Sequence, residues 1–321
     1  MTRVLVTGGA GFIGSHTVDL LMSRGHDVLV VDDLSTGFKA NIARWANDPK
    51  FTFFKADITA DITGTLDQYA AIKGPVERMI HFAAQTAVPL SMDDPVGDIR
   101  VNVMGTVALL EYARRNGIEK VAFASSSAVY DDDAPVPVNE ESRARPSSPY
   151  GIDKLVIEFY LDYYARLYGL KYTALRFMNV YGPRQDPKSY YSGVISIFLD
   201  RAVRNEPITI FDDGEQTRDF VYATDVADAV VKSCLEDGAL GEIINIGTGV
   251  EVTINQTART ILDLAKSRST ITHAPARAGD IRRSVTTMDK AARLLAFQPK
   301  VGLREGLEQT LAWVRTQMIV R

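Results

Sequence analysis

Short apolar runs rich in β-branched and aromatic residues alternate with longer helical patterns through the first half of the chain. The helical patterns end at glycines, which commonly follow the last turn of a helix. Continuously apolar strands that alternate with helices are typical of a parallel sheet covered on both faces. The expected strands are residues 3–8, 27–33, 51–58, 78–84, 120–126 and 171–177, and the main expected helices are residues 12–25, 98–117 and 149–169.

The pattern loosens after about residue 178, where loops rich in Pro, Gly and acidic residues separate shorter elements. Residues 242–249, EIINIGTG, are as apolar as the early strands and could return to the first sheet. We therefore predict an α/β fold, a Rossmann-type doubly wound parallel sheet with a smaller α/β substrate domain. The larger domain is expected to hold residues 1–177 and about 219–247, and the smaller one residues 178–218 and 248–321.

A glycine-rich stretch, VTGGAGFIG, joins the first expected strand to the first helix. Gly9, Gly11 and Gly14 match the pattern G-x-G-x-x-G, and Gly8 gives a second match with the spacing G-x-x-G-x-x-G. Glycine permits the tight turn and lets the backbone approach a pyrophosphate at the helix N-terminus. Asp32 ends the second strand, where a carboxylate accepts hydrogen bonds from the adenosine ribose and repels a 2′-phosphate. The sequence therefore predicts NAD rather than NADP.

Two further carboxylates lie at the ends of expected strands. Asp57, at the end of the third strand, could contact adenine or could be an ordinary turn carboxylate, and its position alone does not separate the two. Asp33 follows Asp32 directly, and we interpret it as a solvated or capping residue.

Composition narrows the class of function. Of the 321 residues 46% are apolar and 24% are charged, as in a soluble globular protein, and the net charge is −4 with no basic block, so we expect no nucleic-acid partner. No apolar run reaches the ~20 residues of a membrane helix, and the N-terminus lacks the order of a signal peptide. Cys234, the single cysteine, fits a reducing cytoplasm. The four histidines have no metal-ligand spacing, so we expect no metal site.

Tyr150 and Lys154 stand four positions apart in the stretch SSPYGIDK. Ser148 and Pro149 before them have the form of a helix start, with Ser148 as N-cap. The spacing places both side chains on one face, where a cation could lower the pKa of the phenol until it acts as a base. The fifth strand ends in three serines, and its carboxyl end lies at the cleft of a parallel sheet. A serine, Tyr150 and Lys154 beside a nicotinamide would form a hydride-transfer site.

At this point the chain resembles the extended short-chain dehydrogenase/reductases, and within them the UDP-hexose 4-epimerases. The resemblance covers nearly the whole chain and rests on TGGAGFIG, VVDD, HFAA, NVMGT, SSSAVY, SPYGIDK, RFMNVYGP, RDFVYATDVADA and RAGD. It implies that Tyr150 is the base, that Lys154 lowers its pKa and holds the nicotinamide ribose, and that Ser126 hydrogen-bonds the 4-oxygen of the sugar. Ser125 and Ser127 are then neighbours that could contact cofactor or sugar.

The same resemblance implies NAD as a permanently bound cofactor, a UDP-sugar substrate and a homodimer. The cofactor residues that it implies are Gly8, Gly11, Phe12, Ile13, Gly14, Asp32, Asp57, Ile58, Phe82, Ala83, Ala84, Asn102, Tyr150 and Lys154. The substrate residues that it implies are Ser126, Asn179, Val194, Thr209, Phe211, Arg218, Arg277, Asp280 and Ser284, the arginines for phosphate and Thr209 and Phe211 for uracil.

The expected reaction is the NAD-dependent 4-epimerisation of UDP-hexoses through a transient 4-keto sugar. Ser127 and Ala128 stand where dehydratases carry an Asp–Glu pair, and Asn179 and Asp186 stand where uronate 4-epimerases tend to carry threonine and arginine. UDP-glucuronate 4-epimerase or another nucleotide-sugar enzyme is the alternative. A nucleotide-sensing scaffold on the same fold is the alternative without catalysis.

Two positions depart from the usual 4-epimerase pattern. Asp131 replaces the glycine after VY, and we favour a solvated acidic turn over a changed loop above the sugar. Ser284 stands where many of these enzymes have a tyrosine that crowds the 2-substituent of the sugar. We therefore expect room for an N-acetyl group, so that UDP-GlcNAc and UDP-GalNAc are substrates beside UDP-glucose and UDP-galactose. The alternative is that Ser284 faces solvent.

Overall fold

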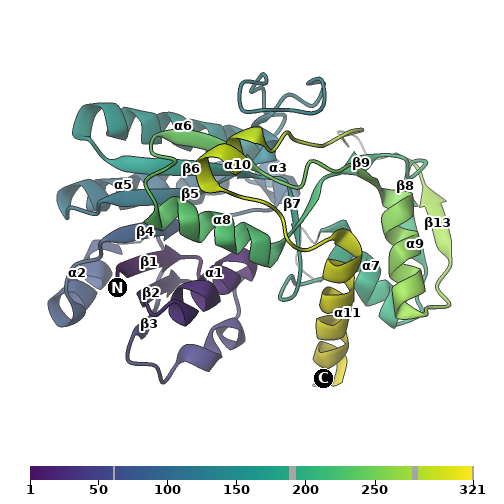
Figure 1. Ribbon diagram of the computed structural model, residues 1–321, viewed down its shortest axis with the longest axis horizontal. Helices are drawn as coiled ribbons and strands as arrows, with labels where there is room; N and C mark the ends of the chain where they lie inside the picture. Colours follow the sequence, from purple (N-terminus) through teal and green to yellow (C-terminus); the bar gives the residue numbers. More distant parts are fainter. Residues whose placement is uncertain (61, 188–192, 277–280, 320–321) are drawn as a thin grey trace.

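A seven-stranded parallel sheet forms the centre of the larger part of the molecule (Figure 1). The computed structural model describes residues 1–60, 62–187, 193–276 and 281–319. The strand order β11-β6-β5-β4-β1-β2-β3 is the Rossmann order 3-2-1-4-5-6 with one strand added, and this confirms the expected fold and the return of residues 242–249. The strands are β1 (Arg3–Thr7), β2 (Asp27–Asp32), β3 (Phe51–Lys55), β4 (Arg78–His81), β5 (Lys120–Ser126), β6 (Lys171–Phe177) and β11 (Glu242–Ile246).

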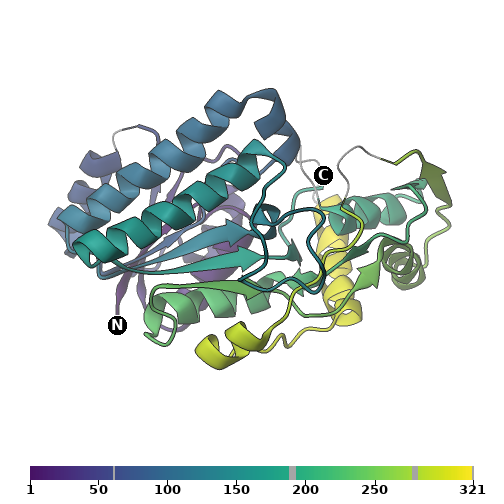
Figure 2. The same cartoon turned by 90° about the horizontal axis from the view of Figure 1, so that it is seen from above.

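Helices cover both faces of this sheet (Figure 2). Alternation along each strand divides the core, because Val4 and Val6 of β1 face one layer of helices and Leu5 faces the other. The first layer is α1 (Phe12–Ser23) and α8 (Ala223–Leu235), joined by α10 (Asp289–Leu295). The second layer is α2 (Ile62–Lys73), α5 (Thr106–Arg115) and α6 (Pro149–Tyr168).

The prediction of a single α-helix over residues 98–117 is wrong in detail. The helices α3 (Val88–Asp93) and α4 (Pro95–Ile99) lead into a π-helical stretch, η3 (Arg100–Gly105), before α5 begins. Gly105 packs against Ile58 so closely that a Cβ there would lie 2.9 Å from the Ile58 Cδ1 atom. The Asn102 side chain is held by the backbone of Gln85. The apolar pattern of the sequence does not distinguish a π turn from an α turn, and such turns occur often at functional sites.

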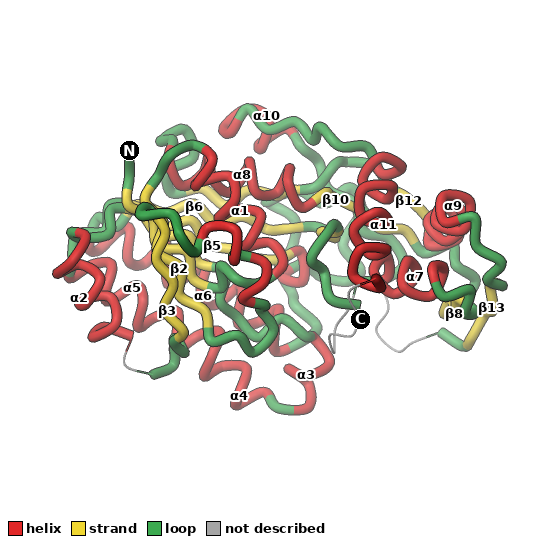
Figure 3. Tube along the Cα trace, turned by 90° about the horizontal axis from the view of Figure 1, so that it is seen from below, coloured by secondary structure: helices red, strands yellow, loops and turns green. Residues whose placement is uncertain are grey.

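The smaller part of the molecule has a core of its own (Figure 3). Apolar side chains of three helices pack with a short parallel pair of strands, among them Phe198, Ile210, Ile261 and Leu311. Its elements are β7 (Asn179–Tyr181), α7 (Val194–Val203), β8 (Ile208–Phe211), β9 (Thr217–Arg218), β10 (Phe220–Tyr222), β12 (Val252–Thr253), α9 (Ile254–Ala265), β13 (Ile271–Ala274) and α11 (Leu303–Ile319).

A buried ion pair fixes α6 to the central sheet. Arg176 of β6 donates to both carboxylate oxygens of Glu158 on α6, at 2.9 and 2.6 Å, and Ser125 of β5 donates to the same carboxylate at 2.6 Å. Removing one partner of such a pair commonly costs ~3–5 kcal/mol, because the other charge is left uncompensated in the core. The position of α6 relative to β5 and β6 is therefore tightly set.

Among the described residues, no helix is both long and apolar enough to cross a bilayer.

Candidate active site

The start of α6 holds two of the three expected catalytic side chains. Ser148 is the N-cap and accepts a hydrogen bond from the Gly151 N–H at 3.2 Å, and Pro149 occupies the first turn. One helical turn then places Tyr150 and Lys154 on the same face, and the Lys154 Nζ atom lies 5.7 Å from the centre of the Tyr150 ring. The structure thus brings the phenol and the ammonium together as the spacing predicts.

Lys154 is buried, and its ammonium is held from two sides. The Nζ atom donates to the Ala124 carbonyl of β5 at 2.7 Å and lies 4.8 Å from the centre of the Phe123 ring. Burial lowers the pKa of Lys154 to about 8, against the attraction of nearby carboxyl groups. The group is therefore mainly an ammonium below pH 8, and a cation so placed favours the ionised form of a neighbouring phenol.

Ser126 is the last residue of β5 and lies close to the start of α6. A single 3-10 turn, η4 (Ser127–Val129), follows it, and the Ser126 Oγ atom accepts from the Ala128 N–H at 3.1 Å. Gly151 of α6 approaches this turn so closely that a Cβ at position 151 would lie 2.3 Å from the Ala128 carbonyl oxygen. Direct backbone contact therefore sets the separation between the strand end and the helix start.

Ser125 has a structural partner. Its buried hydroxyl donates to Glu158, so it belongs to the ion pair beneath the site and is not available to a sugar or cofactor. The expectation that Ser125 could contact a ligand is therefore wrong for its hydroxyl. Ser126, one residue later, points to the opposite face of the strand because side chains alternate along β5.

The glycine-rich loop between β1 and α1 is packed on itself. A Cβ at Gly14 would lie 2.1 Å from the Gly8 carbonyl oxygen, so the first turn of α1 can approach the loop only with glycine there. Asp32 is buried at the end of β2, and its carboxylate accepts from the Ala10 and Leu34 N–H groups at 2.9 and 2.8 Å. Burial raises the pKa of Asp32 and these N–H groups oppose the shift. The carboxylate keeps lone pairs for a ligand, as a ribose site requires.

The other expected cofactor residues lie around the same edge of the sheet. Phe12 and Ile13 form the first turn of α1, and Phe82, Ala83 and Ala84 follow β4 directly.

Two of the expected cofactor residues, Asn102 and Asp57, form hydrogen bonds with the neighbouring backbone. Asn102 is buried and bonds both the N–H and the carbonyl of Gln85, at 2.8 and 3.0 Å, so it supports the loop after β4. Asp57 lies two residues beyond β3 and accepts from the Thr59 N–H at 2.8 Å, which is a turn contact. Ile58 beside it is buried.

The expected substrate residues lie on the smaller part of the molecule, as far as the structure describes them. Arg218 of β9 donates to the carbonyls of Thr217 and Ile281, at 2.7 and 2.6 Å, which brings it beside the segment that begins at residue 281. Asn179 of β7 pairs with β10. Arg277 and Asp280 lie outside the described residues. The remaining four are half-buried or exposed: Val194 at the start of α7, Thr209 and Phe211 on β8, and Ser284.

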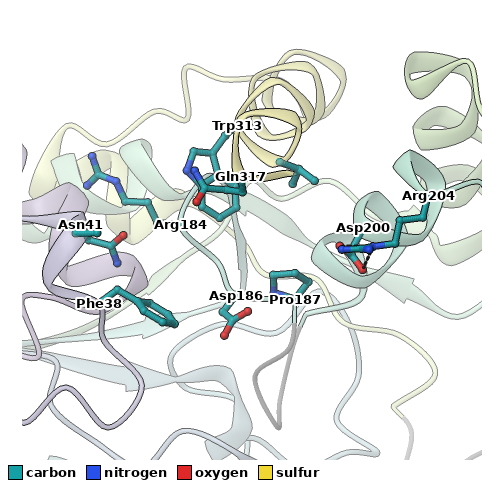
Figure 4. A pocket seen from close by; sticks show the side chains of 11 residues that line it. Phe38, Asn41, Arg184, Asp186, Pro187, Asp200, Arg204, Trp313 and Gln317 are labelled. Carbon is teal, nitrogen blue, oxygen red and sulfur yellow. Dashed lines mark hydrogen bonds and ion pairs between the residues drawn. The ribbon is translucent and has the colours of Figure 1, made fainter. Parts of the chain in front are cut away.

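None of these residues lines the pocket of about 400 Å³ that Figure 4 shows. Phe38 and Trp313 line it together with Arg184, and Arg204 lies at its side, paired with Asp200 at 3.1 Å. Ser126, Tyr150 and Lys154 do not line it. Within the described ranges, no group of three or more His, Cys, Asp or Glu side chains has the arrangement of a metal site.

Comparison with known proteins places the chain in a family. The profile of the NAD dependent epimerase/dehydratase family matches residues 4–247, which is most of the chain. The chain belongs to this family. It is 41% identical to the UDP-glucose 4-epimerase of Mycolicibacterium smegmatis over 317 residues, covering 98% of this chain and 99% of that one.

Solved structures of family members have the same fold throughout. The UDP-glucose 4-epimerase of Thermotoga maritima, solved with UDP-glucose, superposes with a TM-score of 0.92 at 40% identity, covering 99% of this chain and all of that one. A UDP-N-acetylglucosamine 4-epimerase from Methanobrevibacter ruminantium, solved with UDP-N-acetylmuramic acid, has a TM-score of 0.92 at 35% identity and covers 99% of each chain. The resemblance to the extended dehydrogenase/reductases of the 4-epimerase type is confirmed.

Asp131, the departure from the family pattern, is not a solvated acidic turn. Its side chain is only 11% exposed and lies 3.6 Å from Arg143 and 3.9 Å from Arg145. The Asp131 N–H donates to the Arg143 carbonyl at 3.1 Å, and the Ala134 N–H donates to the Asp131 carbonyl at 3.0 Å. The expectation was wrong because the two arginines, twelve and fourteen residues later, return to it across the loop. In this family member Asp131 anchors the loop that follows Ser126.

The pattern analysis also missed polar residues beneath the site. Asp98 and Asp153 lie near enough to Lys154 to affect its pKa, Gln85 bonds Asp98, and Glu158 lies one turn beyond Lys154 on α6. Asp153 stands inside the Tyr150–Lys154 motif, and a carboxylate next to the lysine was the one available signal. Asp98 is 55 residues away from Asp153, so no local pattern could have joined them.

Proposed function

We propose that this protein is an NAD-dependent 4-epimerase of UDP-hexoses. The convergence of Ser126, Tyr150 and buried Lys154 at the carboxyl end of the sheet, beside a glycine-rich loop and Asp32, carries the proposal. The close packing of Gly14 on Gly8 fits a pyrophosphate at the start of α1, which supports NAD as the resident cofactor. The named activities of the similar proteins point to the same reaction.

Tyr150 performs the proton transfers in this proposal. As the phenolate it takes the proton from the sugar 4-hydroxyl, and as the phenol it returns that proton to the 4-oxygen when the ketone is reduced on its other face. NAD held by the glycine-rich loop and Asp32 would supply the acceptor and donor of the C4 hydride. Lys154 stabilises the phenolate as a neighbouring cation, and Ser126 hydrogen-bonds the 4-oxygen so that the C4 hydrogen is correctly aimed. The sugar passes through a 4-ketone and turns between the two transfers.

The smaller part of the molecule is proposed to hold the nucleotide. We assign the diphosphate to Arg218 and Arg277, with Asn179 beside it, because a guanidinium offers paired charge-assisted bonds to phosphate oxygens. Val194, Thr209, Phe211 and Asp280 complete the uridine contacts. We retain the division into residues 1–177 with about 219–247 for the cofactor, and residues 178–218 with 248–321 for the nucleotide sugar.

The direct test is NMR of the sugars formed from a panel of UDP-sugars. We expect UDP-glucose and UDP-galactose to interconvert, and UDP-GlcNAc and UDP-GalNAc to interconvert as well. Turnover confined to UDP-glucuronate would establish the uronate alternative instead. Tight binding of UDP-sugars with no turnover on any of them would favour a sensing role.

Purified protein should already contain NAD, because a cofactor that is regenerated in each cycle need not leave. Denaturation followed by enzymatic assay of the supernatant should release about one NAD per chain. Asp32→Asn is the informative variant, since it removes the carboxylate charge that repels a 2′-phosphate and should increase the share of NADP. NADP as the main nucleotide in the wild type would contradict the cofactor assignment.

We propose that two copies associate through the outer face of α6. Four large apolar side chains repeat along one side of this helix, Ile152, Phe159, Tyr163 and Leu167, and each is between 43% and 67% exposed. An apolar stripe of this length on a surface helix marks an interaction site. A second copy is the occupant that we propose, because one stripe meeting itself across a two-fold axis buries all four residues on both chains.

Phe159→Glu should convert a dimer into a monomer, since it places a charge in the middle of the apolar stripe. Analytical ultracentrifugation should give twice the chain mass for the wild type and the chain mass for the variant. Leu240→Glu, at an exposed leucine outside the stripe, is the matched control and should remain a dimer. A monomeric wild type would contradict the proposal.

We also propose a cytoplasmic location, supported by the lone buried Cys234.

A further inference from the structure

Two buried carboxyl groups lie near Lys154. Asp98 of α4 is 2% exposed and Asp153 of α6 is 3% exposed, and the two carboxyl groups influence each other's pKa. The Oδ2 atom of each is buried and receives no hydrogen bond from any other residue that the structure describes. A buried oxygen without a hydrogen bond lowers the stability of the folded state, so the arrangement of these two carboxyl groups requires a physical explanation.

A hydrogen bond between two carboxyl groups requires a proton on one of them, because an ionised carboxylate can only accept. Gln85 donates its Nε2–H to the Asp98 Oδ1 atom at 2.6 Å, which stabilises the charged form of Asp98. The same amide group is fixed through its contacts with the Ala87 backbone. In a hydrogen bond between the two groups, Asp98 would therefore be the acceptor and Asp153 would hold the proton.

Lys154 is the main counter-ion of the Asp98–Asp153 pair, because the other charged groups nearby are already paired or neutral. Glu158, one turn further along α6, is already paired with Arg176. On the side of β4, His81 is buried and neutral, since burial lowers its pKa to about 3. Ser91 of α3 and Asn102 of η3 contribute neutral groups. A pair that holds one proton carries a single negative charge, which balances the single positive charge of the lysine.

We propose that Asp98 and Asp153 share one proton and, through the charge that they present to Lys154, act as positioning residues that set the pH range in which Tyr150 works as the base. The link to Tyr150 rests on the proposed function, whereas the shared proton rests on the burial of the two carboxyl groups, their unpartnered Oδ2 atoms and the Gln85 contact. Burial, with the neighbouring Asp98, raises the pKa of Asp153 to about 7. The pair therefore holds its proton below neutral pH and loses it above, and the second negative charge then opposes ionisation of the phenol.

Asp153→Asn is the decisive variant, because an amide N–H can donate to Asp98 as the carboxylic acid does but cannot ionise. It fixes the pair in its singly charged form. The acid limb of the pH profile of kcat/KM should then move to lower pH by about one unit, which is a tenfold change in proton affinity. Asp162→Asn, at an exposed carboxylate on the same helix, is the matched control and should leave the profile in place. Asp153→Ser also offers a donor to Asp98 and replaces the asparagine variant should that variant fail to fold.

Infrared titration of the purified protein tests the shared proton without turnover. Wild type and Asp162→Asn should show a buried carboxylic-acid C=O band that disappears as the pH rises through neutrality, and Asp153→Asn should lack it. A wild type without this band, or a band that survives in Asp153→Asn, would overturn the shared proton. A variant whose activity falls equally at every pH, with no shift of the limb, would overturn the effect on Tyr150. Wild-type protein inactive on every UDP-sugar would overturn the proposed function, and the infrared result would still decide the pair.

Discussion

Replacing Tyr150 with phenylalanine should lower kcat for UDP-glucose by at least ~10²–10⁴-fold, the usual contribution of a general acid–base group. The variant loses one oxygen and keeps the ring that lies 5.7 Å from the Lys154 Nζ atom, so the fold and the bound NAD should be retained. Stopped assays of UDP-galactose formation, with NAD content measured on the same samples, check both parts of this expectation.

Tyr160→Phe is the matched control for this experiment. It makes the same chemical change on the same helix, at a residue that is 37% exposed, and should leave kcat near the wild-type value. Near-normal turnover in Tyr150→Phe would contradict the assignment of Tyr150 as the base. Loss of NAD together with turnover would show that the phenol acts mainly in holding the cofactor.

Enlarging Ser284 to tyrosine should remove most activity toward the N-acetyl sugars, with kcat/KM for UDP-GlcNAc falling by two orders of magnitude or more, and should leave UDP-glucose nearly unchanged. Ser284 is half-buried, and the carbonyl of Val285 beside it accepts from the Val138 N–H on the loop that follows Ser126. An added aromatic ring there excludes a 2-acetamido group by contact, and such exclusion is a difference between substrates rather than a general loss.

Ser284→Ala separates the room at this position from the hydroxyl. If space alone matters, the alanine variant should use UDP-GlcNAc as the wild type does. If the hydroxyl bonds the acetamido group, UDP-GlcNAc alone should lose about tenfold. Equal losses on both sugar pairs in Ser284→Tyr, or a wild type unable to use UDP-GlcNAc, would contradict the proposal that the size of residue 284 decides whether an N-acetyl sugar is accepted.

The architecture of the central sheet could be predicted because its signals are local. Each strand is a short apolar run, α1 follows a glycine-rich turn and α6 has a serine cap, so β1 to β6 and the start of α6 follow from neighbouring residues. The meeting of Tyr150 and Lys154 was equally local, since one helical turn joins them. The rule that parallel strands present their carboxyl ends on one edge placed a serine there, and the family resemblance selected Ser126 among the three.

Features that depend on distant partners could not be predicted in this way. Asp131 looks solvated until the loop returns Arg143 to it, and Asp153 looks ordinary until α4 brings Asp98 against it. The π-helical stretch depends on Ile58 packing onto Gly105, and those residues are 47 positions apart. In each case the sequence carries the residue but not the neighbour that determines its state.

The contact of Gly151 with the Ala128 carbonyl has a consequence for how such an enzyme can diversify. Because two backbones touch there, the spacing between the end of β5 and the start of α6 is fixed by the chain itself and offers no side chain for mutation to adjust. Selection for a new sugar would therefore act elsewhere, on side chains such as Ser284, which we propose borders the sugar. The backbone contact therefore keeps the relative position of β5 and α6 constant, while the choice of sugar can change through single substitutions elsewhere.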